Sequence, residues 1–308
     1  MKEHRLAVIL AGLIFCLIVL GGIVHNTGSS LACPDWPTCY GSLMPEMKGG
    51  VAIEHSHRLA AAGVGLLTIV LSVLLSKKRK NLQMLGFFAV FLVVFQGVLG
   101  GVTVLLRLPT VVSTAHLATS FVFLALILYI AQNTKPTKSQ RLFARTTGAS
   151  WVKIAAALVY LQSVLGAFMR HTGAGLVCPD IPFCYGSLWP SHMPPVLLLH
   201  MAHRWFGVLT GLAVLPLPFI IRGGDARVRF LSRMAPLLVL LQIGLGVASV
   251  LTQLGIVAVT AHLGIAALLW SVMVSLSLAT GKARWLASIG ERSRSLPDDP
   301  SSGREVPA

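Results

Sequence analysis

Eight long apolar stretches run along the 308-residue sequence and constrain its fold more than any other feature. A helix needs roughly 20 apolar residues to cross the hydrocarbon core of a bilayer, and each stretch is about that long. Only 11% of the residues are charged, whereas 55% are hydrophobic, a balance that suits lipid rather than water. We therefore predict an all-α membrane protein with eight transmembrane helices. The expected spans are residues 6–25, 56–76, 82–106, 111–131, 151–170, 196–221, 234–252 and 256–279.

The 25 Lys and Arg residues are distributed unevenly between the two sides of these spans. Twenty of them lie at the N-terminus, in the second, fourth and sixth loops, or in the tail. Positively charged loops stay in the cytoplasm, so we predict that both termini are cytoplasmic and that the odd-numbered loops face outside. This distribution also explains the net charge of +15 without a nucleic-acid partner. The five cations on the other side are Lys48, Arg58, Arg107, Arg170 and Arg204.

The first apolar stretch is interpreted as a retained helix rather than a cleaved signal peptide. It is followed by His25, Asn26, Thr27 and Gly28, which do not form a small-residue cleavage site. No Arg- and Ser-rich transit segment precedes it. We therefore predict a multi-pass protein of a bacterial plasma membrane.

The chain contains an internal repeat. Residues 33–45 return as residues 178–190 with 10 of 13 positions identical, and residues 96–117 return as residues 242–263 with 11 of 22 identical. Each half holds four expected helices, an even number, so the second half enters the membrane in the same sense as the first. We predict two four-helix bundles related as a parallel repeat.

The repeat divides the chain into four parts. Residues 1–131 form the first four-helix half and residues 151–280 the second. The polar segment 132–150 is expected to be a cytoplasmic linker. Residues 281–308 are rich in Ser, Pro and charged residues and are expected to be a disordered cytoplasmic tail.

Four histidines recur in matching places, His57 with His203 and His116 with His262. Each is expected a few residues inside the outer end of a helix, at similar depth. One histidine there more often forms a hydrogen bond between helices, but two repeated pairs suit haem iron, which takes an axial ligand on each face. Zinc and copper need more ligands than two imidazoles. We predict bis-histidine haem binding in each half.

The halves differ beside the first histidine of each pair. Glu54 lies three residues before His57 on the same helix face, whereas His200 takes the matching place before His203. A carboxylate beside a porphyrin can transfer protons or stabilise positive charge. The alternative is an ion pair with Arg58, four residues further along the helix.

An arginine directly follows the first histidine in each half, Arg58 in one and Arg204 in the other. A haem propionate needs a cation, and both arginines are candidates to bind one. The alternative is that they reach the membrane interface with no ligand.

Two pairs of cysteines lie in the outer loops, Cys33 with Cys39 and Cys178 with Cys184. An oxidising compartment permits a disulfide in each loop, and we predict both. Either a structural role or a redox role fits the pattern.

Taken together, these motifs resemble the haem A synthase family, and the resemblance extends over roughly residues 5–280. Such a protein is an eight-helix enzyme that oxidises a ring methyl of haem O to a formyl group, giving haem A for cytochrome oxidases. The motifs that carry the resemblance are Glu54-x-x-His57-Arg58, the Thr-Ala-His motifs ending at His116 and His262, the His203-Arg204 pair and the outer-loop cysteine pairs.

The resemblance implies different roles for the two halves. Haem O is expected as substrate between His57 and His116, and haem b as resident cofactor between His203 and His262. Glu54 becomes the catalytic carboxylate. A haem O synthase, an electron donor and the assembly of cytochrome oxidase are the implied partners.

Two other classes of function use the same histidines. One is a membrane haem b protein that only transfers electrons, linked to quinol or thiols. The other is a haem transporter or chaperone that binds without chemistry. Neither needs a carboxylate in one half only.

Overall fold

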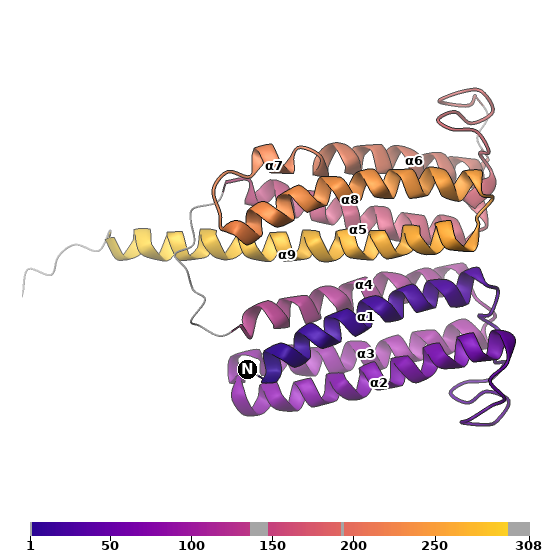
Figure 1. Ribbon diagram of the computed structural model, residues 1–308, viewed down its shortest axis with the longest axis horizontal. Coiled ribbons are helices and arrows are strands. Elements are labelled where there is room, and N and C mark those ends of the chain that lie inside the picture. The colour runs from indigo at the N-terminus through magenta and orange to yellow at the C-terminus, as the bar shows by residue number, and fades with distance from the viewer. Residues whose placement is uncertain (1, 136–146, 192–193, 295–308) are drawn as a thin grey trace, which may run out of the picture.

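The long elements of the structure are all helices (Figure 1). The structure, a computed structural model, describes residues 2–135, 147–191 and 194–294. Eight helices in this part of the chain are long and apolar enough to cross a membrane, so the predicted eight-span all-α fold is confirmed. The elements are α1 (Lys2–Asn26), α2 (Gly49–Lys78), η1 (Lys80–Leu82), α3 (Gln83–Leu105), α4 (Thr110–Asn133), α5 (Ala149–His171), η3 (Ala174–Leu176), α6 (Pro195–Val214), α7 (Leu217–Ile220), α8 (Ala226–Leu251) and α9 (Ile256–Arg294).

The spanning helices form two groups of four. In the first group α1 contacts α2 and α4, and α3 closes the ring between them; in the second, α5 contacts α6 and α9, and α8 closes the ring. Each group has its own apolar core, the first around Leu10, Leu71 and Ile127 and the second around Val152 and Leu276. Each group contains four spanning helices that follow one another along the chain; the division into a substrate half and a cofactor half stays a prediction. A rotation axis along the membrane normal stays a prediction.

Helices α1, α4, α5 and α9 join the two groups. Trp270 of α9 donates a hydrogen bond from its indole to the carbonyl of Phe121 in α4, at 2.9 Å. Its ring also lies 5.4 Å from the ring of Tyr160 in α5, centroid to centroid. A buried indole N–H needs such a partner, so this contact fixes how the two halves meet.

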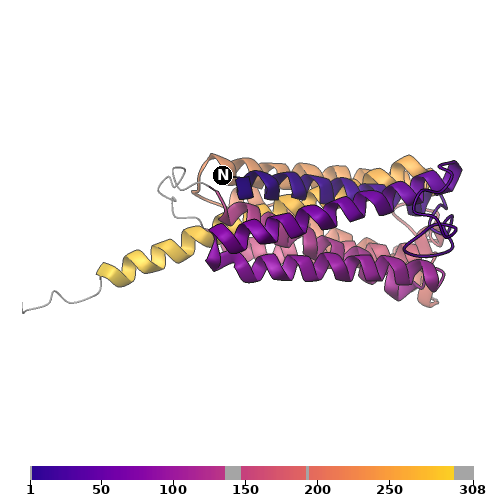
Figure 2. The same cartoon turned by 90° about the horizontal axis from the view of Figure 1, so that it is seen from below.

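The two cysteine-containing loops both lie at one end of the molecule, at opposite corners in the view of Figure 1, and the N-terminus lies at the other end (Figures 1 and 2). We call these the loop end and the N-terminal end. Helices α2, α4, α6 and α9 all begin at the loop end. Residues that lie equally far from the starts of these four helices are therefore at a similar height above the loop end.

Some boundaries differ from those expected. The sixth span is interrupted at Pro216, between α6 and α7, because proline lacks the N–H that would continue the helix. Helix α9 continues to Arg294, so the prediction of a disordered tail is wrong for residues 281–294. That stretch contains Ala, Leu, Lys and Arg, which favour helix. Residues 136–146 of the predicted linker and 295–308 of the predicted tail lie outside the described residues.

Large apolar side chains cover the outward faces of the helices. Phe91 of α3 and Leu240 of α8 are both more than half exposed. Contiguous apolar surface of this kind is costly in water, whereas lipid chains cover it without penalty. The burial pattern therefore agrees with a protein that spans the membrane several times.

Candidate functional site

The first histidine of each predicted pair lies at the same place in its helix. His57 follows Gly49, the first residue of α2, by eight positions, and His203 follows Pro195, the first residue of α6, by the same eight. At a rise of 1.5 Å per residue, each lies about 12 Å from the start of its helix.

The second histidine of each pair is placed in the same way. His116 lies six residues after Thr110 in α4, and His262 lies six residues after Ile256 in α9. This corresponds to about 9 Å from the helix start. All four imidazoles therefore lie at a common level near the loop end.

The partners of each pair occupy diagonal helices of a four-helix group. Helix α2 contacts α1 and α3, so α4 stands opposite it; α6 contacts α5 and α8, so α9 stands opposite it. His57 lies within electrostatic reach of His116, and His203 within reach of His262. Diagonal helices present side chains to each other across the bundle interior, where helical bundles build cofactor sites.

Each imidazole rests on a glycine of a flanking helix. A Cβ placed on that glycine would lie close to the Cε1 atom of the imidazole in every case; at Gly166 it would force the ring to move, and at the other three glycines the contact would be tight. The four contacts are Gly21 of α1 with His57 at 3.2 Å, Gly100 of α3 with His116 at 3.4 Å, Gly166 of α5 with His203 at 2.8 Å, and Gly246 of α8 with His262 at 3.3 Å.

Several of these imidazoles have a nitrogen without a protein partner. The Nδ1 atoms of His57, His116 and His262 are buried and make no hydrogen bond. In the second half, Gln162 Nε2 lies 3.2 Å from His203 Nδ1 and donates to the His203 carbonyl at 3.0 Å. Gln242 Nε2 lies 3.4 Å from His262 Nε2 in a similar way. Buried polar atoms are normally paired, and imidazoles with an unpaired nitrogen are suited to act as metal ligands. The four histidines therefore suit haem iron.

The glycine cradles give a first testable prediction. Gly166→Ala places a Cβ 2.8 Å from His203 Cε1 and must push the ring aside. Overpacking of this kind costs about 1–3 kcal/mol, so we expect haem binding in the second half to weaken roughly tenfold. The haem-to-protein ratio after purification measures it. Gly244→Ala is the matched control, because nothing lies within 4 Å of that position; equal haem loss in both variants would contradict the cradle.

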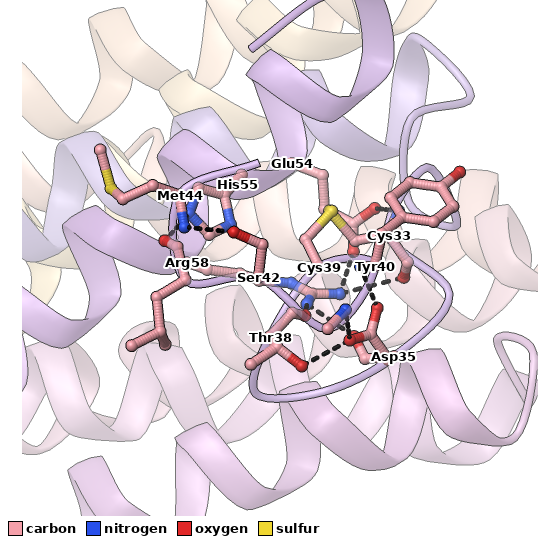
Figure 3. Close-up of a disulfide and its surroundings, with 12 residues drawn as sticks. Cys33, Asp35, Thr38, Cys39, Tyr40, Ser42, Met44, Glu54, His55 and Arg58 are labelled. Carbon is pink, nitrogen blue, oxygen red and sulfur yellow. Dashed lines mark hydrogen bonds and ion pairs between the residues drawn. A yellow bond between two sulfur atoms is a disulfide. The ribbon is translucent and has the colours of Figure 1, made fainter. Parts of the chain in front are cut away.

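Arg58 holds the first cysteine-containing loop against the start of α2 (Figure 3). Its Nη1 donates to the carbonyls of Asp35 at 2.7 Å and Thr38 at 2.5 Å. Its Nη2 donates to the carbonyl of Cys33 at 3.2 Å and to Glu54 Oε1 at 2.5 Å. The guanidinium is thus directed into the loop, a role that the sequence did not suggest.

Both carboxylate oxygens of Glu54 are occupied. Oε1 accepts from Arg58, and Oε2 accepts from the backbone N–H of Cys33 at 2.8 Å. The side chain is only 4% exposed. The ion pair considered as an alternative from the sequence is present, and the catalytic role of Glu54 stays a prediction.

Arg204 repeats this arrangement in the second half. Its Nε donates to His200 Nε2 at 2.8 Å, and His200 Nδ1 lies 2.7 Å from the carbonyl of Ala174. A neutral imidazole that donates from Nδ1 and accepts at Nε2 satisfies both contacts. His200 therefore replaces the carboxylate as acceptor for the arginine, which accounts for its position. The carbonyls that Arg204 binds are those of Cys178, Asp180 and Phe183.

Both predicted disulfides are present in the structure, Cys33 with Cys39 and Cys178 with Cys184. All four cysteines are fully buried. His55 lies beside the first bridge, and its Nε2 lies 3.0 Å from the carbonyl of Leu43. The bridges close the loops that Arg58 and Arg204 hold; a redox role stays a prediction.

Asp35 organises the interior of the first loop. Its carboxylate accepts from Thr38 Oγ1 at 2.5 Å and from the backbone N–H groups of Tyr40 at 2.6 Å and Gly41 at 2.9 Å. The hydrogen bond from Thr38, with those from the backbone, lowers the pKa of Asp35 to about 2. Because the pKa is lowered, the stabilisation is complete above the ordinary carboxyl pKa of about 4 and is lost as the pH falls through about 2.

We expect Asp35→Asn to loosen this loop at neutral pH, because an amide accepts these hydrogen bonds less well than a carboxylate. Faster hydrogen exchange of the peptide covering residues 35–45 measures the effect. Asp180→Asn is the matched control in the second loop, where Asp180 accepts a hydrogen bond from Gly186 at 3.0 Å. Exchange that is equally fast in both loops, or unchanged in Asp35→Asn, would count against this role.

A further pair of histidines lies where the two halves meet. His25 of α1 and His171 of α5 stand edge to face with ring centroids 5.0 Å apart. His171 Nδ1 lies 3.2 Å from Thr114 Oγ1, and Asn26 Nδ2 donates to Thr260 Oγ1 at 3.0 Å. These threonines precede His116 and His262 by two residues. His25 and His171 are 146 residues apart, the same separation as between His57 and His203 and between His116 and His262. This shared separation is the signal in the sequence that could have revealed them.

Comparison with known proteins identifies the family of this chain. The model of the COX15-CtaA family, described as cytochrome oxidase assembly protein, matches residues 4–52 and 45–274. The chain belongs to this family. The COX15-CtaA match includes the four histidines, both arginines and both cysteine pairs.

Relatives of this COX15-CtaA chain carry the name Heme A synthase. The protein of Shouchella clausii is 31% identical over 262 residues, which cover 80% of this chain and 86% of the relative. That of Lysinibacillus sphaericus is 29% identical over 291 residues, covering 87% and 92%. That of Symbiobacterium thermophilum is 32% identical over 235 residues, covering 70% and 75%.

Proposed function

We propose that this protein is a haem A synthase, an enzyme that oxidises a ring methyl of haem O to the formyl group of haem A. The observation that carries the proposal is the placement of four imidazoles as two diagonal pairs in glycine cradles at one level of the membrane. The family and the names of the relatives support the same activity.

The two halves take different haems in this proposal. Haem O occupies the first half between His57 and His116, and haem b occupies the second between His203 and His262. The asymmetry at Glu54 supports the division, because the matching residue of the second half, His200, is used as a neutral acceptor for arginine.

The protein's own residues bind, orient and enclose the porphyrins. The histidines hold iron, and the glycines set the position of each imidazole. Arg58 and Arg204 fix the disulfide loops to the starts of α2 and α6, the helices that carry His57 and His203. The predicted binding of haem propionates by Arg58 and Arg204 stays part of the proposal. It would use those N–H groups of the two guanidinium groups that make no hydrogen bond to the loops. Haem b, when bound, supplies one-electron transfer.

The proposed oxidation takes place in two balanced steps. The methyl group and one water give the alcohol with the loss of two electrons and two protons; the alcohol and a second water give the hydrated aldehyde with the same loss, and the hydrate then loses water. A separate electron acceptor takes the four electrons. Each oxidation releases protons beside the first site. Glu54 lies three residues from His57 on the same face of α2, and it is the carboxylate placed to accept a proton there. The carboxylate is also paired with Arg58, which fixes its position on the helix.

The proposed location is a bacterial plasma membrane with both termini in the cytoplasm. The positive-inside rule supports this orientation. The disulfides support it too, because the loop end then faces an oxidising compartment. A haem O synthase in the same membrane supplies the substrate, a separate donor or acceptor completes the electron balance, and the product serves cytochrome oxidase assembly.

Pigment analysis tests the proposed activity. The protein is produced in a host that makes haem O and lacks its own haem A synthase, and the extracted haem is identified by mass. We expect haem A or the hydroxymethyl intermediate with the wild-type chain, and neither with His57→Ala. Haem b alone would instead indicate an electron-transfer protein, and unmodified haem O alone would indicate a carrier; either result contradicts the proposal.

A further inference from the structure

A pocket of ≈ 240 Å³ lies at the N-terminal end, far from the loop end that holds the histidine pairs. Residues of both four-helix groups line it, with α1 and α4 on one side and α8 and α9 on the other. The proposed haem chemistry makes no use of this pocket.

The lining is polar toward the helix ends and apolar further along the helices. Arg227 near the start of α8, Gln132 near the end of α4 and Lys135 just after it form the polar part, which we call the mouth, whereas Ala11 of α1 and Leu128 of α4 lie further from the helix ends. Ala11 lies seven residues beyond His4, another lining residue, which is about 10 Å along the helix. The polar lining residues, which we call the charged layer, are thus about 10 Å from the apolar ones. The headgroup of a lipid and the start of its acyl chains are arranged in the same order at the surface of a bilayer.

The charged layer is fixed in place by hydrogen bonds. Arg227 donates from Nη1 to Gln132 Oε1, which turns the guanidinium toward the junction of the two groups. His4 Nδ1 lies 2.9 Å from the carbonyl of Ala131, which holds the imidazole on the opposite wall. No carboxylate is among the side chains that line the pocket in the described part of the chain. The nearest acid in sequence, Asp225, caps α8 by accepting from the N–H of Val228 at 2.9 Å.

We propose that this pocket binds the phosphate headgroup of an anionic phospholipid, with an acyl chain along the apolar wall of Ala11 and Leu128. An arginine with free donors matches the oxygens of a phosphodiester, and basic pockets between membrane helices recognise such lipids. The lipid contacts helices of both groups and therefore joins the two halves. The proposal does not depend on which side of the membrane the N-terminal end faces, nor on the proposed enzymatic activity.

Lipid titration of the full-length protein in detergent, followed by native mass spectrometry, tests this site. The probes are phosphatidylglycerol and phosphatidylcholine with the same acyl chains, and inorganic phosphate. We expect the wild type to bind phosphatidylglycerol in preference to phosphatidylcholine, and Arg227→Gln to weaken that binding about tenfold. Arg229→Gln is the matched control, because Arg229 lies on the same helix but donates to the carbonyl of Gly224 and does not line the pocket.

Thermal unfolding gives a second readout. Phosphatidylglycerol should raise the unfolding midpoint of the wild type and of Arg229→Gln, but not that of Arg227→Gln. Lys135→Glu reverses an exposed charge at the mouth and should also lose the preference, which keeps the test valid if Arg227→Gln folds poorly. Equal binding of the two lipids, an equal effect of inorganic phosphate, or equal loss in both arginine variants would overturn the proposal.

Discussion

His203→Ala is expected to remove the resident haem from the second half and leave the first half able to bind its own. In the proposed site His203 provides one of the two axial ligands. Among the described residues, His203 is the histidine that lies against Gly166, so no second imidazole is in position to replace it. Loss of a direct ligand should weaken haem binding by at least tenfold, because even changes to the residues that orient a ligand cost roughly 10–100-fold. The measurement is haem b per protein after purification, with the visible spectrum of the remaining haem.

The control for this prediction is His25→Ala, which removes an imidazole near the boundary between the halves that is not proposed as a ligand. His25→Ala should keep its haem b, and His262→Ala should lose it as His203→Ala does. Retention of haem b in either ligand variant would show that the two imidazoles do not form one site.

Glu54→Ala is expected to abolish haem A formation and to destabilise the protein as well. The buried carboxylate pairs with Arg58 and accepts from the N–H of Cys33, so its removal leaves a charged guanidinium and an amide without their partner. Breaking a buried ion pair costs about 3 kcal/mol or more, which corresponds to a fall of roughly 5–10 °C in the unfolding midpoint. Haem A content and thermal unfolding measure the two effects separately.

Substitutions of Glu54 that keep an acceptor separate the catalytic from the structural role. Glu54→His copies the second half, in which His200 accepts from Arg204, and should recover much of the stability. If Glu54 accepts protons during catalysis, Glu54→Gln should bind haem O and still make no haem A. Normal haem A in Glu54→Gln would leave the carboxylate with a positioning role only. The reciprocal His200→Glu should have little effect on haem b content.

The membrane fold could be predicted from the sequence because each step depends on local composition. A span is recognised by its own apolar residues, and all eight predicted spans overlap helices of the structure, although α2 begins seven residues and α8 eight residues before the predicted start. The internal repeat placed four histidines in matching positions without any knowledge of packing. Helix ends were less accurate, as at Gly49 and Pro216, because they depend on caps and on proline rather than on hydropathy.

The partners of the arginines could not be predicted in the same way. Arg58 and Arg204 follow histidines in helices, and nothing in their own segments says that their donors are directed toward loop carbonyls about 20 residues away. The glycine cradles could not be predicted either, since nothing in the sequence around Gly100 and Gly246 indicates that an imidazole lies against them. Contacts between distant segments depend on tertiary packing, which a single sequence does not display.

The different partners of the two arginines bear on how a duplicated protein acquires two functions. A neutral His200 and a charged Glu54 both accept from arginine, so the loop can be held in either half. The two residues differ in charge, since a carboxylate brings a negative charge to the first half where a neutral imidazole stands in the second. The exchange of Glu54 for His200 is therefore the difference between the halves on which the proposed division of roles rests.

The most direct test of the account is an experimental structure of the protein loaded with haem O. It should show one porphyrin iron coordinated by the imidazoles of both His57 and His116, with Glu54 beside the same ring. A map that placed the iron on other residues, or turned either imidazole toward lipid, would contradict the account.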